Sequence, residues 1–203
     1  NEKFGIIDRL LALAQAFNGL LCLYSNGIEG HGDLKPENFL YCNLDDNLHL
    51  DNDSWLYDHP WLIKVADFGW ADAWIDYGYT TKAFRHYMAP ERFEREGGKF
   101  IPEKSDMFAM GIIAAELLQD KHPATNLKKA KKSEGRWLKW VEKHEPDLHA
   151  INSERMKNLI KDCLHPDYNQ RPTAKKCLDK ICCELREEHN LDVAPTLQEW
   201  RRD

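Results

Sequence analysis

The sequence predicts a mainly α-helical domain with one small β-hairpin. Two segments, residues 4–24 and 105–118, carry apolar side chains at helical spacing over faces so broad that both helices should be buried. Two short stretches rich in aromatic and β-branched residues, 39–41 and 61–65, predict a pair of strands. We therefore expect a helical core with the hairpin at its edge.

The composition is that of a globular protein. The chain has 203 residues, of which 42% are hydrophobic and 31% charged, and this length can bury one core. A net charge of −6 disfavours nucleic-acid binding. We expect no membrane association, because no apolar run approaches the roughly 18 residues of a span. Six cysteines without zinc-type spacing predict reduced thiols in a cytoplasmic protein.

The helix limits follow from local signals. Asn26-Gly27 ends the first helix, since glycine accepts positive φ. The next long helix opens at Ser105-Asp106, where the Asp106 carboxylate can serve as an N-cap. A third helix, capped by Ser153, ends near residue 164, and the last long helix runs from a Thr173 cap to about residue 188.

The two strands are joined by an unusually long connection. Residues 43–60 far exceed the 2–5 residues of an ordinary hairpin loop, and they include five aspartates but no lysine or arginine. We expect an acidic, solvated insertion in place of a docking site. The spacing lacks the glycine and terminal glutamate of an EF-hand, so we predict no metal there.

The chemistry is concentrated in residues 31–40, which have the sequence His-Gly-Asp-Leu-Lys-Pro-Glu-Asn-Phe-Leu. Asp33 can accept a proton from a hydroxyl nucleophile, and Lys35 can stabilise negative charge on a phosphoryl group in transfer. Asn38 can hold a metal ion that bridges nucleotide phosphates. Pro36 fixes φ and removes a donor, which indicates a shaped loop.

This stretch resembles the catalytic loop of eukaryotic-type protein kinases, His-Arg-Asp-Leu-Lys-x-x-Asn. One position differs, because Gly32 stands where arginine is usual. Three later motifs match the same family in order and spacing: Asp67-Phe68-Gly69, Ala89-Pro90-Glu91 and Arg171-Pro172. The resemblance covers nearly all of residues 1–203, but only the second half of a kinase domain, its C-terminal lobe.

The resemblance implies a function and a set of site residues. Asp33 and Lys35 would be catalytic, Asn38 and Asp67 would hold Mg²⁺, and Leu40 would form the floor under the adenine of ATP. The γ-phosphoryl group would pass to Ser or Thr of a protein substrate, since tyrosine kinases usually have another residue at Lys35. Glu37 resembles a residue that some kinases use to read a basic side chain before the acceptor.

The resemblance also implies structural contacts and limits. Asp106 would accept hydrogen bonds from the catalytic-loop backbone, and Arg171 would pair with Glu91. Phe68 would pack against His31. No glycine-rich loop or strand lysine precedes the catalytic loop in this chain, and residue 1 is not Met. We therefore expect the isolated lobe to be inactive and a regulatory partner or flanking domain to complete it.

Two other functional classes stay open. A pseudokinase would use the same fold as a binding module, although Asp33, Asn38 and Asp67 are all present. A small-molecule phosphotransferase of the aminoglycoside or choline kinase type shares the His-Gly-Asp opening and the later Asn. That class should lack the Ala-Pro-Glu segment and Arg171.

The segment between Asp67 and Glu91 carries four hydroxyl side chains as candidate phosphorylation sites, Tyr77, Tyr79, Thr80 and Thr81. In kinases with arginine at the place of Gly32, a phosphate on this segment neutralises the guanidinium and orders the loop. Glycine offers no such charge. We therefore expect activity that does not need this phosphorylation, with Arg85 as the competing phosphate contact.

Overall fold

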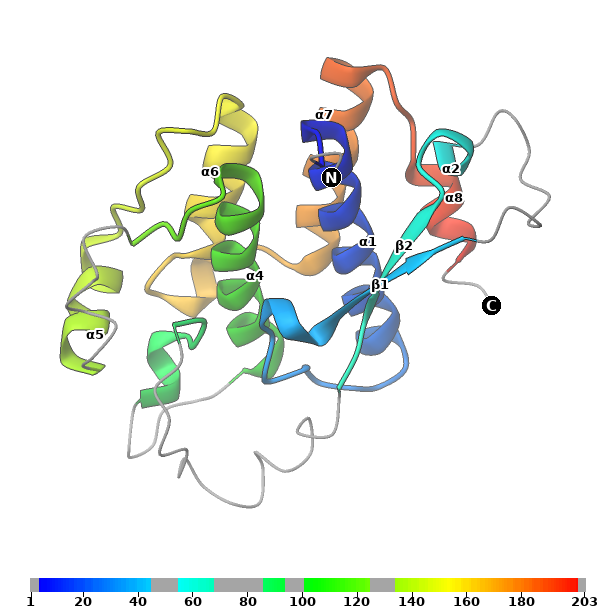
Figure 1. Ribbon diagram of the computed structural model, residues 1–203. Coiled ribbons are helices and arrows are strands. Elements are labelled where there is room, and N and C mark those ends of the chain that lie inside the picture. Colours follow the sequence, from blue (N-terminus) through cyan, green and yellow to red (C-terminus); the bar gives the residue numbers. More distant parts are fainter. Residues whose placement is uncertain (1–3, 45–54, 68–85, 94–100, 125–133, 201–203) are drawn as a thin grey trace.

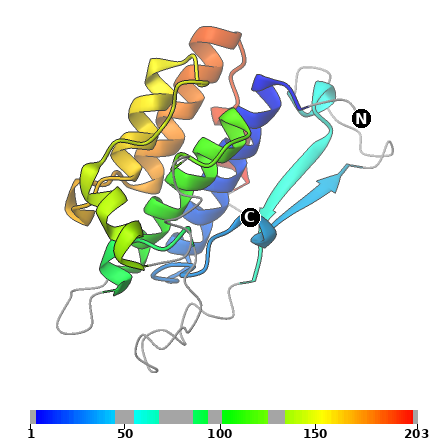
Figure 2. The ribbon, with the colours of Figure 1, turned by 60° about the vertical axis from the view of Figure 1, so that its left-hand side comes forward.

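The computed structural model describes residues 4–44, 55–67, 86–93, 101–124 and 134–200. Four long helices form the core: α1 (Ile6–Ser25), α4 (Pro102–Gln119), α6 (Glu154–Cys163) and α7 (Ala174–His189). α1 packs against α7 and α4, α4 also packs against α6, and α6 packs against α7. Figures 1 and 2 show these four helices side by side as a bundle. The prediction of a mainly helical core is confirmed.

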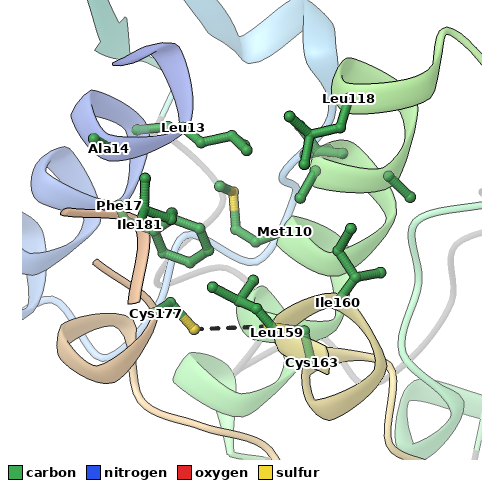
Figure 3. Packing of buried hydrophobic residues seen from close by; sticks show 14 of the residues in the cluster. Leu13, Ala14, Phe17, Met110, Leu118, Leu159, Ile160, Cys163, Cys177 and Ile181 are labelled. Carbon is green, nitrogen blue, oxygen red and sulfur yellow. Dashed lines mark hydrogen bonds between the residues drawn. The ribbon is translucent and has the colours of Figure 1, made fainter. Parts of the chain in front are cut away.

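The bundle interior is closed by apolar side chains from all four helices. Figure 3 shows Phe17 of α1, Met110 of α4, Leu159 of α6 and Ile181 of α7 pointing toward one another, and each is at most 1% exposed. Burying a side chain of this size typically contributes about 1.5–3 kcal/mol. This packing fixes α1 and α4, which hold the loop of residues 31–32 between them.

The hairpin lies along one side of the bundle (Figure 2). β1 (Phe39–Asn43) pairs antiparallel with β2 (Trp61–Val65), with Phe39 opposite Val65 and Asn43 opposite Trp61. β2 faces α1, where the Gln15 side-chain oxygen accepts a hydrogen bond from the Ile63 amide at 2.8 Å. The two predicted strands are confirmed.

Smaller elements complete the fold. A 3₁₀ turn, η1 (Pro36–Asn38), leads into β1, and another, η2 (Pro90–Phe93), precedes α4. α5 (Glu134–Lys143) and the turn η5 (Tyr168–Gln170) flank α6, and α8 (Ala194–Glu199) ends the described chain. Part of the insertion 43–60 is packed and not solvated: α2 (Trp55–Asp58) buries Trp55, whose ring lies 5.7 Å from that of Trp200.

The predicted helix ends agree closely with the helix ends in the structure, with one exception. Ser153 and Thr173 cap α6 and α7 by accepting hydrogen bonds from backbone amides, and Gly27 has a φ of 84° after α1. α4, however, begins at Pro102, so Asp106 lies inside the helix and the prediction that it opens or caps the helix is wrong. Proline is favoured in the first helical turn because its missing N–H would have no partner there.

α1 corrects a second expectation. Among the described residues it is a helix long and apolar enough to cross a membrane by length and composition. The statement that no apolar run approaches that length was therefore wrong. More than half of this segment is buried within the domain, and core helices of globular proteins pass the same test. Length and composition are thus weak evidence for a membrane span here.

Candidate active site

The loop between α1 and β1 is fixed to α4 by one carboxylate. Asp106 accepts a hydrogen bond from the His31 amide at 2.6 Å and one from the Gly32 amide at 2.9 Å. The Tyr24 hydroxyl donates to the same carboxylate at 3.0 Å. Burial raises the pKa of Asp106, whereas these three donors act in the opposite direction. The predicted contact between Asp106 and the catalytic-loop backbone is confirmed.

His31 joins this loop to the end of β2. Its Nδ1 accepts a hydrogen bond from the Asp33 amide at 3.3 Å, and its Nε2 lies 2.8 Å from the Ala66 carbonyl oxygen. A neutral ring with the proton on Nε2 satisfies both contacts. The fully buried imidazole therefore holds the segment that precedes Asp67 against the loop that carries Asp33.

Asp33, Lys35 and Asn38 meet in one cluster. The Lys35 ammonium donates to the Asp33 carboxylate at 2.7 Å, and the two side chains are 23% and 12% exposed. The Asn38 side-chain nitrogen donates to the Asp33 carbonyl at 2.8 Å. Because the side-chain nitrogen of Asn38 makes this bond, the side-chain oxygen, which can ligate a cation, points away from the Asp33 carbonyl. An anionic acceptor, a cation and an amide thus share a small volume, as the sequence predicted.

The hairpin places Asp67 next to this cluster. The Ala66 amide donates to the Asn38 carbonyl at 2.9 Å, so Asp67 directly follows a residue paired with Asn38. Asp67 is exposed and has a φ of 65°. Its carboxylate and the Asn38 amide oxygen are the ligand types that Mg²⁺ prefers, and Mg²⁺ commonly takes only one or two carboxylates from the protein. The residues present therefore fit a magnesium–nucleotide complex.

Leu40 is 55% exposed on β1. Its role under an adenine ring stays a prediction. Tyr41, the next residue, is 50% exposed and stacks on Trp61 with ring centroids 6.1 Å apart. The hairpin thus offers apolar side chains beside the polar cluster.

A buried ion pair anchors the segment that ends at Glu91. The Arg171 guanidinium binds both Glu91 carboxylate oxygens, at 2.7 and 2.8 Å. It also donates to the carbonyl oxygens of His165 at 2.8 Å, Lys104 at 2.9 Å and Pro166 at 3.3 Å. Arg171 is 2% and Glu91 5% exposed. The pair expected from the sequence is confirmed.

Sequence reasoning missed two contacts near the loop. Arg92, on η2, donates through Nη1 to the Gly32 carbonyl, and Trp137, on α5, donates to the Met88 carbonyl at 2.9 Å. Both donors are buried. Arg92 directly follows the Ala-Pro-Glu motif, but no local pattern indicates its partner 60 residues away.

Several expectations fall outside the described residues. Phe68 and its packing against His31, Gly69 and Arg85 all lie there. So do the four candidate phosphorylation sites, Tyr77, Tyr79, Thr80 and Thr81.

The comparison with known families identifies the family of this chain. Residues 8–181 match the protein kinase domain. The chain belongs to the eukaryotic-type protein kinase family. The Asp33 cluster, Asp67 and the Glu91–Arg171 pair all lie within the matched residues.

The kinase chain is similar to several curated proteins. It is 32% identical over 182 residues to calcium/calmodulin-dependent protein kinase type I of Schizosaccharomyces pombe, covering 87% of this chain and 49% of that protein. It is 38% identical over 114 residues to serine/threonine-protein kinase ksp1 of the same yeast, covering 55% and 21%. For dual specificity mitogen-activated protein kinase kinase sek-1 of Caenorhabditis elegans the identity is 27%, covering 85% and 48%. The chain thus spans half or less of the length of these relatives.

Proposed function

We propose that this chain is the C-terminal lobe of a serine/threonine protein kinase, which transfers the γ-phosphoryl group of ATP to Ser or Thr hydroxyls of protein substrates. The observation that carries the proposal is the Asp33 cluster. A partly exposed carboxylate contacts an ammonium at 2.7 Å, and an amide held to the same aspartate lies beside the Asp67 segment. Phosphoryl transfer depends mainly on such positioning and charge.

Each residue has a distinct task in this proposal. Asp33 orients the substrate hydroxyl and accepts its proton, while Lys35 stabilises charge on the phosphoryl group. Asn38 and Asp67 hold Mg²⁺, which neutralises the phosphate oxygens when it is bound. Leu40 supports the adenine ring from β1. The presence of Lys35 supports Ser/Thr specificity, and one of the similar proteins, ksp1, is named a serine/threonine-protein kinase.

We assign residues 1–203 as one lobe, with 43–60 as an acidic insertion between its strands. The mainly helical fold with one exposed hairpin supports this assignment. A cavity of about 830 Å³ lies between the ends of α1, α6 and α7 and not over Asp33. A second lobe would then cover the nucleotide. We also propose a cytoplasmic location, which the six free cysteines support.

The alternatives differ in what the site must do. A small-molecule phosphotransferase is disfavoured by the match to the protein kinase domain and by the Glu91–Arg171 pair. A pseudokinase would bind partners without phosphoryl transfer. Asp33, Asn38 and Asp67 argue against it, and the decision rests on activity.

The test uses the complete protein with a basic, serine-containing protein as substrate. We expect Asp33→Asn and Asp67→Asn each to lower phosphate transfer about 100-fold or more, with melting temperatures close to that of the parent. Asp179→Asn is the matched control, because this exposed carboxylate on α7 is distant from the site in sequence and pairs only within its helix through Lys175. Undiminished transfer in either site variant would refute the assignment.

A second experiment tests the lobe assignment. We expect residues 1–203 alone to bind magnesium-ATP weakly and to show no catalytic turnover. In this proposal the chain supplies the metal ligands and the residue under the adenine ring, and a second lobe covers the nucleotide. Calorimetry on the isolated chain and on the complete protein would measure this difference. Micromolar binding with turnover by the isolated chain would show that the lobe is sufficient.

A further inference from the structure

The glycine in the catalytic loop has a special backbone conformation. Gly32 has a φ of 79°, a region that residues with a Cβ rarely adopt. Its amide is bound by Asp106, and its carbonyl points away from that carboxylate to a different partner. Position 32 therefore contributes backbone groups to the site and no side chain.

The partner of that carbonyl is a buried arginine. Arg92 is only 7% exposed and donates through Nη1 to the Gly32 oxygen. Burying a guanidinium costs free energy unless its donors are satisfied, so the hydrogen bond to the Gly32 oxygen offsets part of the cost of burying Arg92. The space between Gly32, Asp33, Arg92 and α4 is nearly filled, with a residual cavity of about 10 Å³.

Together these contacts clamp the peptide unit that precedes Asp33. Its carbonyl, from Gly32, is held by Arg92, and its N–H, from Asp33, donates to His31. The orientation of this peptide sets the direction in which the Asp33 side chain leaves the backbone. Without the Arg92 contact, one side of the peptide would lose its restraint while Asp106 still held the preceding amides.

We propose that Arg92 is a positioning residue for Asp33: its guanidinium holds the Gly32 carbonyl and so fixes the catalytic carboxylate. The inference deepens the proposed function and rests on it for the role of Asp33. Arg92 lies on η2, one residue after Glu91. The end of the segment between Asp67 and Glu91 is thereby linked to the catalytic loop by a contact that does not involve the Arg171 pair.

The experiment compares three variants of the complete protein. Arg92→Met keeps side-chain length but removes every donor, and Arg92→Lys keeps one charged donor. Arg9→Met is the matched control, because the partly buried Arg9 also donates to a backbone carbonyl, that of Leu117 at 2.7 Å, on another side of α4. Each variant is assayed for kcat, for the KM of ATP and of protein substrate, and for melting temperature. Amide hydrogen exchange at residues 31–33 is measured in parallel.

We expect Arg92→Met to lower kcat about 10- to 100-fold, as misplacement of a catalytic group does, while the KM for ATP changes less than about threefold. The lysine variant should recover part of kcat. Exchange at the Asp33 amide should be faster in Arg92→Met than in the parent, because Asp106 still holds the His31 and Gly32 amides. Arg9→Met should leave both kcat and this exchange unchanged.

Three results would overturn the inference. These are parental kcat and exchange in Arg92→Met, an equal loss of kcat in Arg9→Met, or a fall in kcat explained by the unfolded fraction alone. If the parent itself transfers no phosphate, the proposed function fails, and hydrogen exchange then decides the Arg92 contact alone. Faster exchange at the Asp33 amide would support it, and parental exchange would refute it.

Discussion

Removing either partner of the Glu91–Arg171 pair should strongly destabilise the protein, and by unequal amounts. Glu91→Ala leaves a guanidinium that is buried without its counter-charge but keeps its carbonyl partners. Breaking a buried ion pair in this way costs about 3–5 kcal/mol. Arg171→Met leaves the Glu91 carboxylate without its charged partner and also deprives three carbonyl oxygens of a donor.

The difference between the two variants can be worked from those contacts. A buried polar group that loses its partner costs about 1–3 kcal/mol. Arg171→Met should therefore lower the free energy of unfolding by at least about 1 kcal/mol more than Glu91→Ala. Because domains are stable by only about 5–15 kcal/mol, the arginine variant should approach complete unfolding.

Urea unfolding of the complete protein, followed by tryptophan fluorescence, measures both changes. The exposed pair of Lys175 and Asp179, with side chains 54% and 58% exposed, provides the control. Asp179→Ala should change stability by less than about 1 kcal/mol. A similarly small change in Glu91→Ala would refute the argument from burial. A smaller loss in Arg171→Met than in Glu91→Ala would show that the carbonyl contacts carry no net energy.

Three further predictions test other parts of the structure. Gly111→Ala should destabilise the protein by about 1–3 kcal/mol because a Cβ there would lie 2.8 Å from the Cys163 Cβ. Thermal unfolding measures this loss of stability, with Ala115→Gly as the control. A neutral effect of Gly111→Ala would mean that α4 and α6 are less closely packed. Burial and Asp106 raise the pKa of Tyr24, so its contribution to stability is present below about pH 10 and is lost as pH rises further. In a Tyr24→Phe variant the free energy of unfolding should therefore fall less steeply with rising alkaline pH. Equal slopes of this free energy against pH in variant and parent would contradict the prediction. The last variant replaces four hydroxyl residues with Phe or Val: Tyr77, Tyr79, Thr80 and Thr81. Its initial rate of phosphate transfer should stay near that of the untreated parent. A loss of about 100-fold, or about 2.7 kcal/mol, that phosphomimetic residues restore would show dependence on phosphorylation.

The helical core was predictable because its signals are local. Apolar periodicity and caps predicted α1, α6 and α7 to within about two residues, since a buried helix needs an apolar face and its first amides need acceptors. The start of α4 was misplaced because a plausible N-cap, Asp106, competed with the proline signal at Pro102. In the structure this carboxylate serves a distant backbone instead of its own helix.

The site was predictable where one short motif contains it. Asp33, Lys35 and Asn38 lie within six residues, so the spacing alone brings them together once the loop is shaped. The position of Asp67, one residue after the Ala66 amide that donates to the Asn38 carbonyl, depends on strand pairing, and both strands were predicted. The buried Trp55 of the insertion was missed because its aspartates dominated the interpretation.

Arg92 shows why part of the site could not be predicted. Its contact requires the positive φ of Gly32, which turns the carbonyl, and a fold that brings η2 beneath the loop. Neither condition can be recognised from the sequence around position 92. From the sequence, Gly32 indicated only the loss of a guanidinium that a phosphate could contact. In the structure a guanidinium is present but buried, and its hydrogen bond to the Gly32 carbonyl already engages it. That bond uses one N–H of a guanidinium that has five, so the obstacle to a phosphate contact is the burial of Arg92, where an anion would lose its hydration.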